Sequence, residues 1–278
     1  MKISNLKTEE VVKKSRKSRC LPLSGGLWSD FPFLSSAGKI FLQLFSFFLP
    51  RECPLCGKMP ADGRENFFCK ECLEELHFVK QPVCNSCGGE LTGILEMCPD
   101  CLHTKGKRPW KKALSLFIME GKVQEVIYRY KYRNDTSLAR PLGMLCAEKL
   151  LASDIHADVI AYTPLHWARC LQRGYNQAEL LAKEISKHTN IPIEKLLKRR
   201  RFTRQQATLG RKERIKNMQN AFCALSREKI RNKKILLIDD VLTTGATLYS
   251  ATEELLKKGA LEVYILVAAR RQSNQNVF

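Results

Sequence analysis

The sequence predicts an α/β protein with a mostly parallel sheet flanked by helices, preceded by a small cysteine-rich module. Two observations predict this architecture. From about residue 111 onward, short segments that are apolar on both faces alternate with amphipathic helical segments, as in parallel sheets. Between residues 53 and 101, eight cysteines fall in four C-x-x-C pairs, a spacing typical of metal sites. Residues 1–38 show no clear period, and we expect them to form a disordered extension.

The composition is that of a globular chain with a strongly basic balance. The chain has 278 residues, of which 44% are apolar, and a formal net charge of +19. The excess of lysine and arginine is concentrated in runs at residues 2–19, 105–112, 195–216 and 227–234. Such runs indicate an anionic partner, which is nucleic acid, a phosphorylated metabolite or a membrane surface. A solvated, lysine-rich face is the alternative interpretation.

The twelve cysteines indicate a reducing compartment rather than a secreted disulfide scaffold. A disulfide scaffold would be shorter, whereas here roughly 170 residues with three lone cysteines follow the last pair. The longest mostly apolar run, residues 40–50, is too short to span a bilayer. Arg51, Glu52 and Cys53 follow it, where cleavage of a signal peptide would need small residues. We therefore expect a cytoplasmic protein with no stable membrane span.

The four cysteine pairs are evenly spaced, with twelve, eleven and ten residues between successive pairs. Each pair can place two thiolates on one edge of a metal, so eight ligands make two tetrahedral sites. "CPLCGK" and "CNSCGGE" look like zinc knuckles, with a glycine for the left-handed turn. The pattern favours sequential over interleaved pairing and structural zinc over an iron–sulfur cluster, and leaves both alternatives open. The predicted ligands of this double zinc ribbon, residues 39–108, are Cys53, Cys56, Cys69, Cys72, Cys84, Cys87, Cys98 and Cys101.

The larger domain is expected to span residues 109–278. Segments that are apolar throughout predict strands at 113–119, 158–164, 233–240 and 262–269. Apolar residues at helical spacing predict helices at 122–132, 137–152, 175–188 and 247–258, the last of them ended by Gly259 as a left-handed cap. Because ligands bind beyond the carboxyl ends of parallel strands, the residues that follow each strand are the candidate site.

The segment "KKILLIDDVLTTGATLYS" joins a buried strand to a helix through an unusual turn. Asp239 and Asp240 stand at the expected carboxyl end of the strand. The small residues of Thr243–Thr247 expose backbone N–H groups at a helix N-terminus, which makes a cradle for phosphate. Carboxylates repel phosphate but accept hydrogen bonds from hydroxyls next to it, such as the 2′- and 3′-hydroxyls of a ribose. The segment therefore predicts a receptor for a ribose 5-phosphate.

The stretch "LLIDDVLTTGATL" resembles the phosphoribosyl pyrophosphate (PRPP) loop of type I phosphoribosyltransferases. The resemblance implies the type I phosphoribosyltransferase fold for the larger domain. It also implies that PRPP is the ligand, with Mg²⁺ carried mainly by the ligand and water. The carboxylate pair would hold the ribose and the loop the 5-phosphate. The implied PRPP-binding residues are Asp239, Asp240, Thr243, Thr244, Gly245, Ala246 and Thr247.

Three further stretches narrow the resemblance to the ComF family, whose members have been linked to competence for DNA uptake. They are "YKYRND", "TPLHWARCLQRGYNQAELLA" and "TRQQATLGRKERIKNMQNAF". In the first, Asn134 replaces the glycine of the family pattern, and asparagine tolerates the positive φ of a turn. The resemblance covers about residues 40–270. It implies a pyrophosphate-side loop with Pro164, Leu165, His166, Arg169 and Arg173, and a mobile hood with Gln206, Arg211, Arg214 and Asn217.

The sequence leaves three functions open. The first is a phosphoribosyltransferase with an unidentified acceptor, for which no catalytic residue is predicted because no acid–base pair stands out. The second is a sensor of PRPP or of a nucleotide, without chemistry. The third is a non-catalytic zinc-ribbon adaptor that binds single-stranded DNA or a DNA helicase or translocase. The complete PRPP loop favours the first two, the basic runs favour the third, and one chain can combine them.

Overall fold

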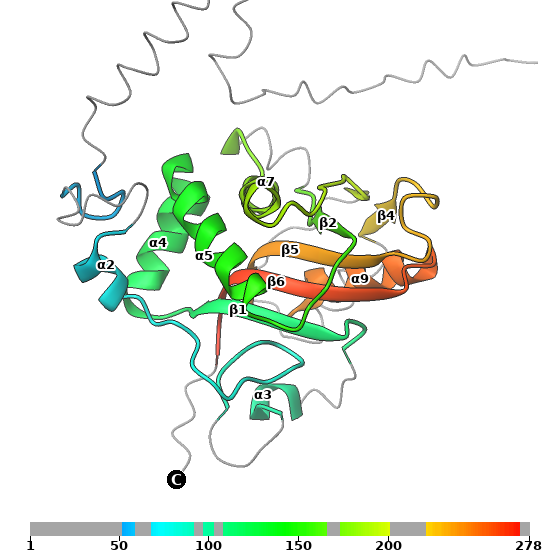
Figure 1. The fold of residues 1–278 in the computed structure, drawn as a ribbon, viewed down its shortest axis with the longest axis horizontal. Coiled ribbons are helices and arrows are strands. Elements are labelled where there is room, and N and C mark those ends of the chain that lie inside the picture. The colour runs from blue at the N-terminus through cyan, green and yellow to red at the C-terminus, as the bar shows by residue number, and fades with distance from the viewer. Residues whose placement is uncertain are drawn as a thin grey trace, which may run out of the picture.

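The sheet forms because four segments that are apolar on both faces pair side by side in parallel. The computed structural model describes residues 52–58, 68–91, 97–102, 108–165, 173–200 and 221–272. The parallel strands are β1 (Lys112–Ile118), β2 (Val159–Tyr162), β5 (Lys234–Leu242) and β6 (Glu262–Arg270). They lie in the order β1–β6–β5–β2 (Figure 1). A separate antiparallel pair joins β3 (Leu197–Arg199) to β4 (Phe222–Ala224). The predicted parallel sheet is confirmed.

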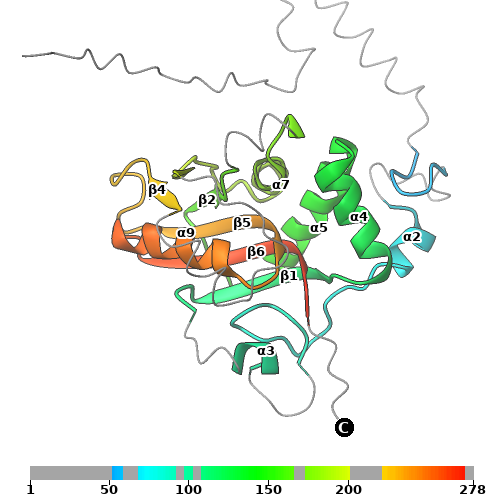
Figure 2. The same ribbon diagram turned by 180° about the vertical axis from the view of Figure 1, so that it is seen from behind.

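Helices flank the sheet on both faces. α4 (Gly121–Tyr132), α5 (Ala139–Leu151) and α7 (Gln177–Thr189) cover one face, and α9 (Ala246–Lys257) covers the other (Figures 1 and 2). A 3₁₀ turn, η1 (Thr136–Leu138), precedes α5. Two short helices, α2 (Lys70–Glu74) and α3 (Pro99–Leu102), belong to the cysteine-rich segment. The four helices that the periodicity predicts in the larger domain are therefore present.

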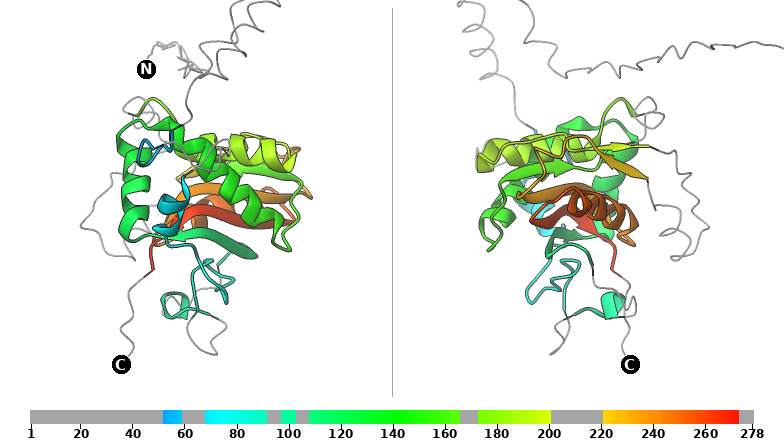
Figure 3. Two further views of the ribbon diagram at one scale, coloured as in Figure 1. Left: turned by 60° about the vertical axis from the view of Figure 1, so that its left-hand side comes forward. Right: turned by 90° about the vertical axis from the view of Figure 1, so that its right-hand side faces the viewer.

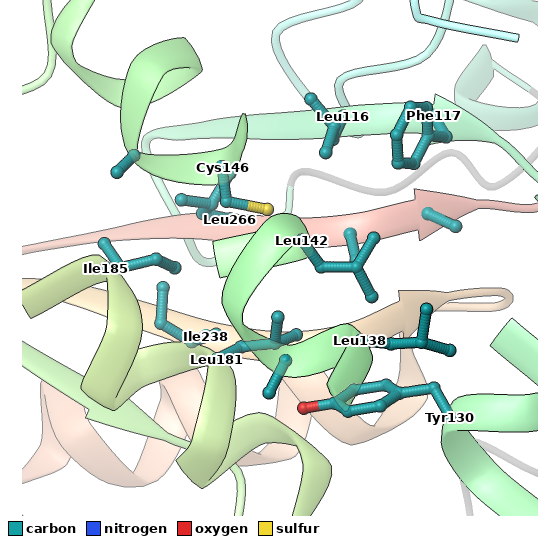
Figure 4. Close-up of a cluster of buried hydrophobic side chains, with 14 of the residues drawn as sticks. Leu116, Phe117, Tyr130, Leu138, Leu142, Cys146, Leu181, Ile185, Ile238 and Leu266 are labelled. Atoms are coloured by element: carbon teal, nitrogen blue, oxygen red, sulfur yellow. The ribbon is translucent and has the colours of Figure 1, made fainter. Parts of the chain in front are cut away.

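Alternation along each strand divides the core into two layers. In β5, Leu236 faces the layer under α5 and α7, whereas the next residue, Leu237, faces the layer under α9. Figure 4 shows the first layer, which includes Leu142 and Cys146 of α5 and Leu181 of α7. Both faces are buried, which explains why the strand sequences are apolar throughout rather than alternating.

The two cysteine clusters extend these two layers. The first cluster, with its neighbour Leu76, packs into the layer of α4, α5 and α7. The second, with Trp110, packs into the layer of α9. Figures 1 and 3 show α2 beside α4, and α3 on the other side of β1. Gly88 lies so close to β1 that a Cβ there would come within 2.6 Å of the Ser115 nitrogen. The cysteine-rich module is therefore part of the core of the larger domain.

One strand boundary differs from the expectation. β5 continues past Asp240, because Val241 and Leu242 still pair with Ala269 and Arg270 of β6. The two aspartates therefore lie inside the last part of the strand rather than at its end.

Two turn residues behave as the sequence predicts. Asn134 has a φ of 53°, so this asparagine does adopt the positive φ that the sequence predicts for the turn. Gly259 follows α9 with a φ of 93°, as expected of a left-handed cap. Within the residues described above, no helix combines the length and apolar character that crossing a membrane requires. Residues 1–38 and the apolar run at 40–50 lie outside the described residues, and the cytoplasmic location stays a prediction.

Candidate functional site

The eight paired cysteines form two four-sulfur clusters. Cys53, Cys56, Cys69 and Cys72 make the first, and Cys84, Cys87, Cys98 and Cys101 make the second. The four Sγ atoms of each cluster lie within 4.8 Å of one another. The Sγ atoms of Cys87 and Cys98 are 3.5 Å apart, and those of Cys56 and Cys69 are 3.6 Å apart. Tetrahedral zinc with bonds of ~2.3 Å places its sulfurs roughly 3.8 Å apart. The pairing is therefore sequential, and the geometry fits zinc.

A buried arginine supports the assignment of metal to the second cluster. Arg270, at the end of β6, is only 2% exposed. Its Nη1 donates to the Cys87 Sγ at 2.6 Å and its Nη2 to the Cys98 Sγ at 3.5 Å. A guanidinium keeps its charge in a protein, so its burial requires negative partners. Four thiolates around one Zn²⁺ leave a net negative charge that meets this requirement.

The first cluster is attached to α4 by Arg129. Its Nη2 donates to the Pro54 carbonyl at 2.6 Å and its Nη1 to the Leu55 carbonyl at 3.2 Å, both inside the first C-x-x-C turn. The same guanidinium pairs with Asp135, with Nη2 2.6 Å from Oδ2. Asp135 belongs to the stretch "YKYRND", so this acid orients the arginine that holds the zinc-binding turn.

The two aspartates of β5 have different partners. Oδ1 of Asp239 accepts a hydrogen bond from Oγ1 of Thr163 at 2.7 Å, just after β2. Asp240 pairs with Lys131 of α4, with Nζ 3.1 Å from Oδ1 and side chains that are 20% and 14% exposed. Burial raises the pKa of Asp239 to about 7, and the carboxylate of Asp240 is the second cause. Lys131 offsets part of the negative charge of the two aspartates.

The loop Thr243–Thr247 leaves backbone donors unused. Gly245 has a φ of 76°, in the left-handed region that favours glycine, and α9 begins at the next residue. Among the described residues, no acceptor takes the backbone N–H of Thr243, Thr244 or Gly245. These donors stand at a helix N-terminus, where the helix dipole adds positive potential. The loop therefore has the backbone chemistry of an anion cradle.

Two of the stretches that carry the family resemblance pack against each other beside the aspartates. The carbonyl of Tyr130 accepts from the Tyr175 hydroxyl at 2.6 Å and from Nε2 of Gln177 at 3.3 Å. In return, the Tyr130 hydroxyl donates to the Gln177 carbonyl at 2.8 Å. Asn176 caps α7 and donates to the Thr163 carbonyl at 3.0 Å. These contacts hold α4 and α7 where Lys131 and Thr163 reach the aspartates.

Part of the predicted site is described by the structure. The seven predicted PRPP-loop residues form one continuous strand–loop–helix segment, and Pro164 and Leu165 follow β2. Arg173 donates to Oε1 of Gln177 at 3.3 Å and lies over the Tyr132 ring at 4.8 Å. The predicted residues that lie outside the described part are His166, Arg169, Gln206, Arg211, Arg214 and Asn217.

Sequence reasoning missed Lys131 and Thr163 as neighbours of the aspartates. Both belong to stretches that carry the family resemblance, and that membership is the sequence feature that could have indicated them. Nothing in local spacing shows that a lysine on α4 and a threonine after β2 meet the same strand, because the contacts bridge 109 and 76 positions of sequence.

Together, the sheet, the loop after β5 and the two sulfur clusters define a phosphoribosyltransferase-like domain with a double zinc ribbon. The family model for a phosphoribosyl transferase domain matches residues 141–277, and the model for a double zinc ribbon domain matches residues 44–102. The expected domain bounds of 39–108 and 109–278 are wider than these matches and stay predictions.

The chain belongs to the ComF family of competence proteins. It is 32% identical to Competence protein F of Haemophilus influenzae, over 74% of this chain and 97% of that relative. It is 27% identical to DNA utilization protein YhgH of Escherichia coli, over 80% and 98%. It is 25% identical to Competence protein ComFC of Bacillus subtilis, over 69% and 78%. Similar solved structures include adenine phosphoribosyltransferase from Leishmania tarentolae, with 13% identity and a TM-score of 0.35, over 57% of this chain and 91% of that chain.

Proposed function

We propose that this protein binds PRPP or a related ribose 5-phosphate through the segment that joins β5 to α9. The observation that carries the proposal is the pair Asp239 and Asp240, placed just before a loop in which the N–H groups of residues 243–245 meet no acceptor among the described residues. Carboxylates accept charge-assisted hydrogen bonds from ribose hydroxyls, and the loop of Thr243–Thr247 suits the 5-phosphate. Lys131 offsets carboxylate charge beside the site and so reduces the repulsion of an anionic ligand.

Magnesium fits this site as a companion of the ligand. Mg²⁺ usually keeps several waters and binds through one or two carboxylates together with substrate phosphates. Asp239 and Asp240 are the carboxylates that suit this role among the residues proposed to bind the ligand. When bound, Mg²⁺ would neutralise charge on the pyrophosphate. The chain itself would hold and orient the ribose and its 5-phosphate.

Titration calorimetry with PRPP and Mg²⁺ tests the proposal. Replacing Asp239→Asn and Asp240→Asn together should weaken PRPP binding by about two to four powers of ten. This range follows because each charge-assisted hydrogen bond contributes roughly 1.5–3 kcal/mol and about 1.4 kcal/mol is a factor of ten. The control is Asp154→Asn, an exposed carboxylate that pairs with Lys112. Wild-type affinity in the double variant would show that the ribose assignment is wrong.

Two further measurements separate the parts of the ligand and the kind of function. Thr244→Val should weaken PRPP and ribose 5-phosphate alike and leave non-phosphorylated ribosides unaffected. Pyrophosphate release from PRPP, measured with a panel of acceptors, separates a transferase from a sensor. Release with one acceptor would identify the transfer reaction, whereas binding of PRPP without release would favour a sensor.

Binding of single-stranded nucleic acid is a second candidate function, favoured by an exposed cluster on α4. Tyr128 and Tyr132 are 53% and 52% exposed, with ring centroids 5.3 Å apart. Arg133 lies over the first ring at 5.8 Å and Arg173 over the second at 4.8 Å. Exposed aromatic rings stack on bases, and arginines meet phosphates. The relatives named for competence and for DNA utilization support a role in DNA uptake.

Only parts of the basic runs can be examined for this candidate, because the structure describes few of their residues. In the run at 105–112, Lys111 pairs with Glu262, and Lys112 pairs with Asp154 at 2.5 Å. The run at 195–216 lies mostly outside the described residues. The aromatic cluster is therefore the sharper target for an experiment.

Fluorescence anisotropy of a labelled oligothymidylate tests the nucleic-acid candidate. Tyr128→Ala and Tyr132→Ala should each weaken binding about tenfold, because stacking contributes roughly 1–3 kcal/mol per base. The matched control is Leu261→Ala, which removes an apolar side chain that is 59% exposed. Affinity should also fall steeply with salt if phosphates are contacted. Unchanged affinity in both tyrosine variants would exclude this surface as the binding site.

A further inference from the structure

An arginine next to the zinc ribbon contacts the proposed phosphate loop. Arg108 precedes β1, and its Nη1 donates to the Thr244 carbonyl at 3.1 Å. The guanidinium lies against Gly245 so closely that a Cβ at that position would overlap it. The missing side chain of Gly245 therefore serves two purposes: it permits the left-handed φ, and it leaves room for Arg108.

Arg108 is in turn held by the second zinc-binding turn. The guanidinium lies over the ring of Trp110, 5.0 Å from its centroid. Trp110 is buried, and its Nε1 donates to the Ser86 carbonyl at 2.7 Å. Ser86 stands between the ligands Cys84 and Cys87. Three successive contacts thus connect a metal-binding turn to a loop some 160 positions later in the chain.

The contact of Arg108 with the Thr244 carbonyl also orients a backbone N–H donor of the phosphate loop, because both groups belong to one peptide. In a trans peptide the C=O and the following N–H point in opposite directions. A guanidinium that holds the Thr244 carbonyl on one side of the loop therefore directs the Gly245 N–H to the other side. A donor that is already oriented does not have to be ordered when an anion binds, which raises affinity.

We propose that Arg108 is a positioning residue through which the second zinc site preorganises the phosphate loop. The inference rests on the proposed binding of a ribose 5-phosphate. Order in the phosphate loop then depends on the metal state of the second cluster. The first cluster is held by Arg129 on α4, the helix whose Lys131 pairs with Asp240, and no described contact leads from it to the phosphate loop.

The order of the loop in the zinc-loaded, ligand-free protein is the direct readout. Backbone ¹⁵N relaxation should give Gly245 and its neighbours order parameters near the rigid value of about 0.85 in the wild type, and below about 0.6 in Arg108→Ala. Ribose 5-phosphate affinity, measured by calorimetry, should fall about tenfold. Zinc content should stay at two per chain. The control is Arg231→Ala. This exposed arginine lies just before the start of β5, whereas the phosphate loop follows the end of that strand.

Three further variants sharpen the test. Arg108→Lys keeps the charge but loses the planar group that stacks on Trp110. Its loop order and its affinity for ribose 5-phosphate should lie between those of the wild type and the alanine variant, and it remains informative if the alanine variant folds poorly. Cys84→Ser should loosen the loop as Arg108→Ala does, whereas Cys53→Ser, in the first cluster, should leave it ordered. Equal effects of the two cysteine variants would overturn the proposed route.

The outcomes separate this inference from the proposed function. A loosened loop together with weaker binding supports it. Weaker binding with an unchanged loop would mean that Arg108 contacts the ligand itself, which overturns the positioning role. A loosened loop with unchanged affinity would also overturn it. If the wild type binds no ribose 5-phosphate, the proposed function fails. The order parameters then test the connection between the second zinc site and the loop by themselves. It is supported if they decrease in Arg108→Ala and in Cys84→Ser but not in Cys53→Ser, and it is overturned by any other result.

Discussion

Replacing Asp239 with asparagine is expected to stabilise the folded protein at neutral pH while weakening ligand binding. Burial raises the pKa of Asp239 from 3.8 to about 7, with the neighbouring carboxylate of Asp240 as the second cause. Between about pH 4 and pH 7, the folded chain therefore holds a proton that the unfolded chain has released. The stability of the wild type should fall as the pH rises through this window and level off above it. An asparagine carries no charge, and its Oδ1 can still accept from Thr163.

The size of the effect follows from the two pKa values. At about 1.36 kcal/mol per pKa unit, the rise from 3.8 to about 7 corresponds to roughly 4 kcal/mol at most. An asparagine also buries an amide group that needs hydrogen-bond partners of its own, and this cost offsets part of the gain. We therefore expect Asp239→Asn to add about 2 kcal/mol above neutral pH. In a chain of this size, that is a rise in Tm of about 4–8 °C.

Thermal unfolding of zinc-loaded protein at about pH 5 and about pH 8 measures this gain. The difference between variant and wild type at each pH isolates Asp239, because protonation of the cysteines is common to both. The gain should be larger at the higher pH. The control is Asp154→Asn, whose carboxyl has a pKa lowered by the hydrogen bond from Lys112, so its removal should give no gain. An Asp239→Asn variant that is no more stable than the wild type at the higher pH would refute the raised pKa.

Four other predictions concern the zinc sites, the arginine that supports the first of them, and the ion pair of Lys131 with Asp240. Metal analysis should find about two zinc atoms per chain of reduced protein. Cys84→Ser should lower Tm more than Cys53→Ser, because within the described part of the chain it is the second cluster whose sulfurs balance a buried arginine; equal losses would contradict this. Arg129→Ala should loosen the first zinc-binding turn, seen as faster zinc transfer to a chelator from one of the two sites, and unchanged transfer would refute the attachment. Lys131→Met should destabilise the fold by about 2 kcal/mol by denaturant titration, because it leaves the carboxylate of Asp240 unpaired in a largely buried place; a stability equal to that of the wild type would show that the pair contributes nothing.

Much of the fold follows from local patterns in the sequence. Runs such as residues 235–238 are apolar on both faces, which predicts a strand covered on two sides, and helical spacing predicts α4, α5, α7 and α9. The residues that follow a buried strand are the natural place for a ligand, so the loop after β5 could be predicted from the sequence. The position where β5 ends could not be predicted in this way. Its last residues belong to the strand because they pair with β6, which is equally long.

The sequence by itself determined the two modules, the set of eight metal ligands and the loop chemistry, because each depends on residue types at short spacing. Only the tertiary structure decided which cysteine pairs share a metal. It also decided that Arg270 faces the sulfurs, that Lys131 faces Asp240 and that Arg108 faces Thr244. These partners are far apart in the chain and belong to different strands, helices and loops. Their meeting depends on the order of strands in the sheet and on the face that each helix covers, and no local pattern encodes either.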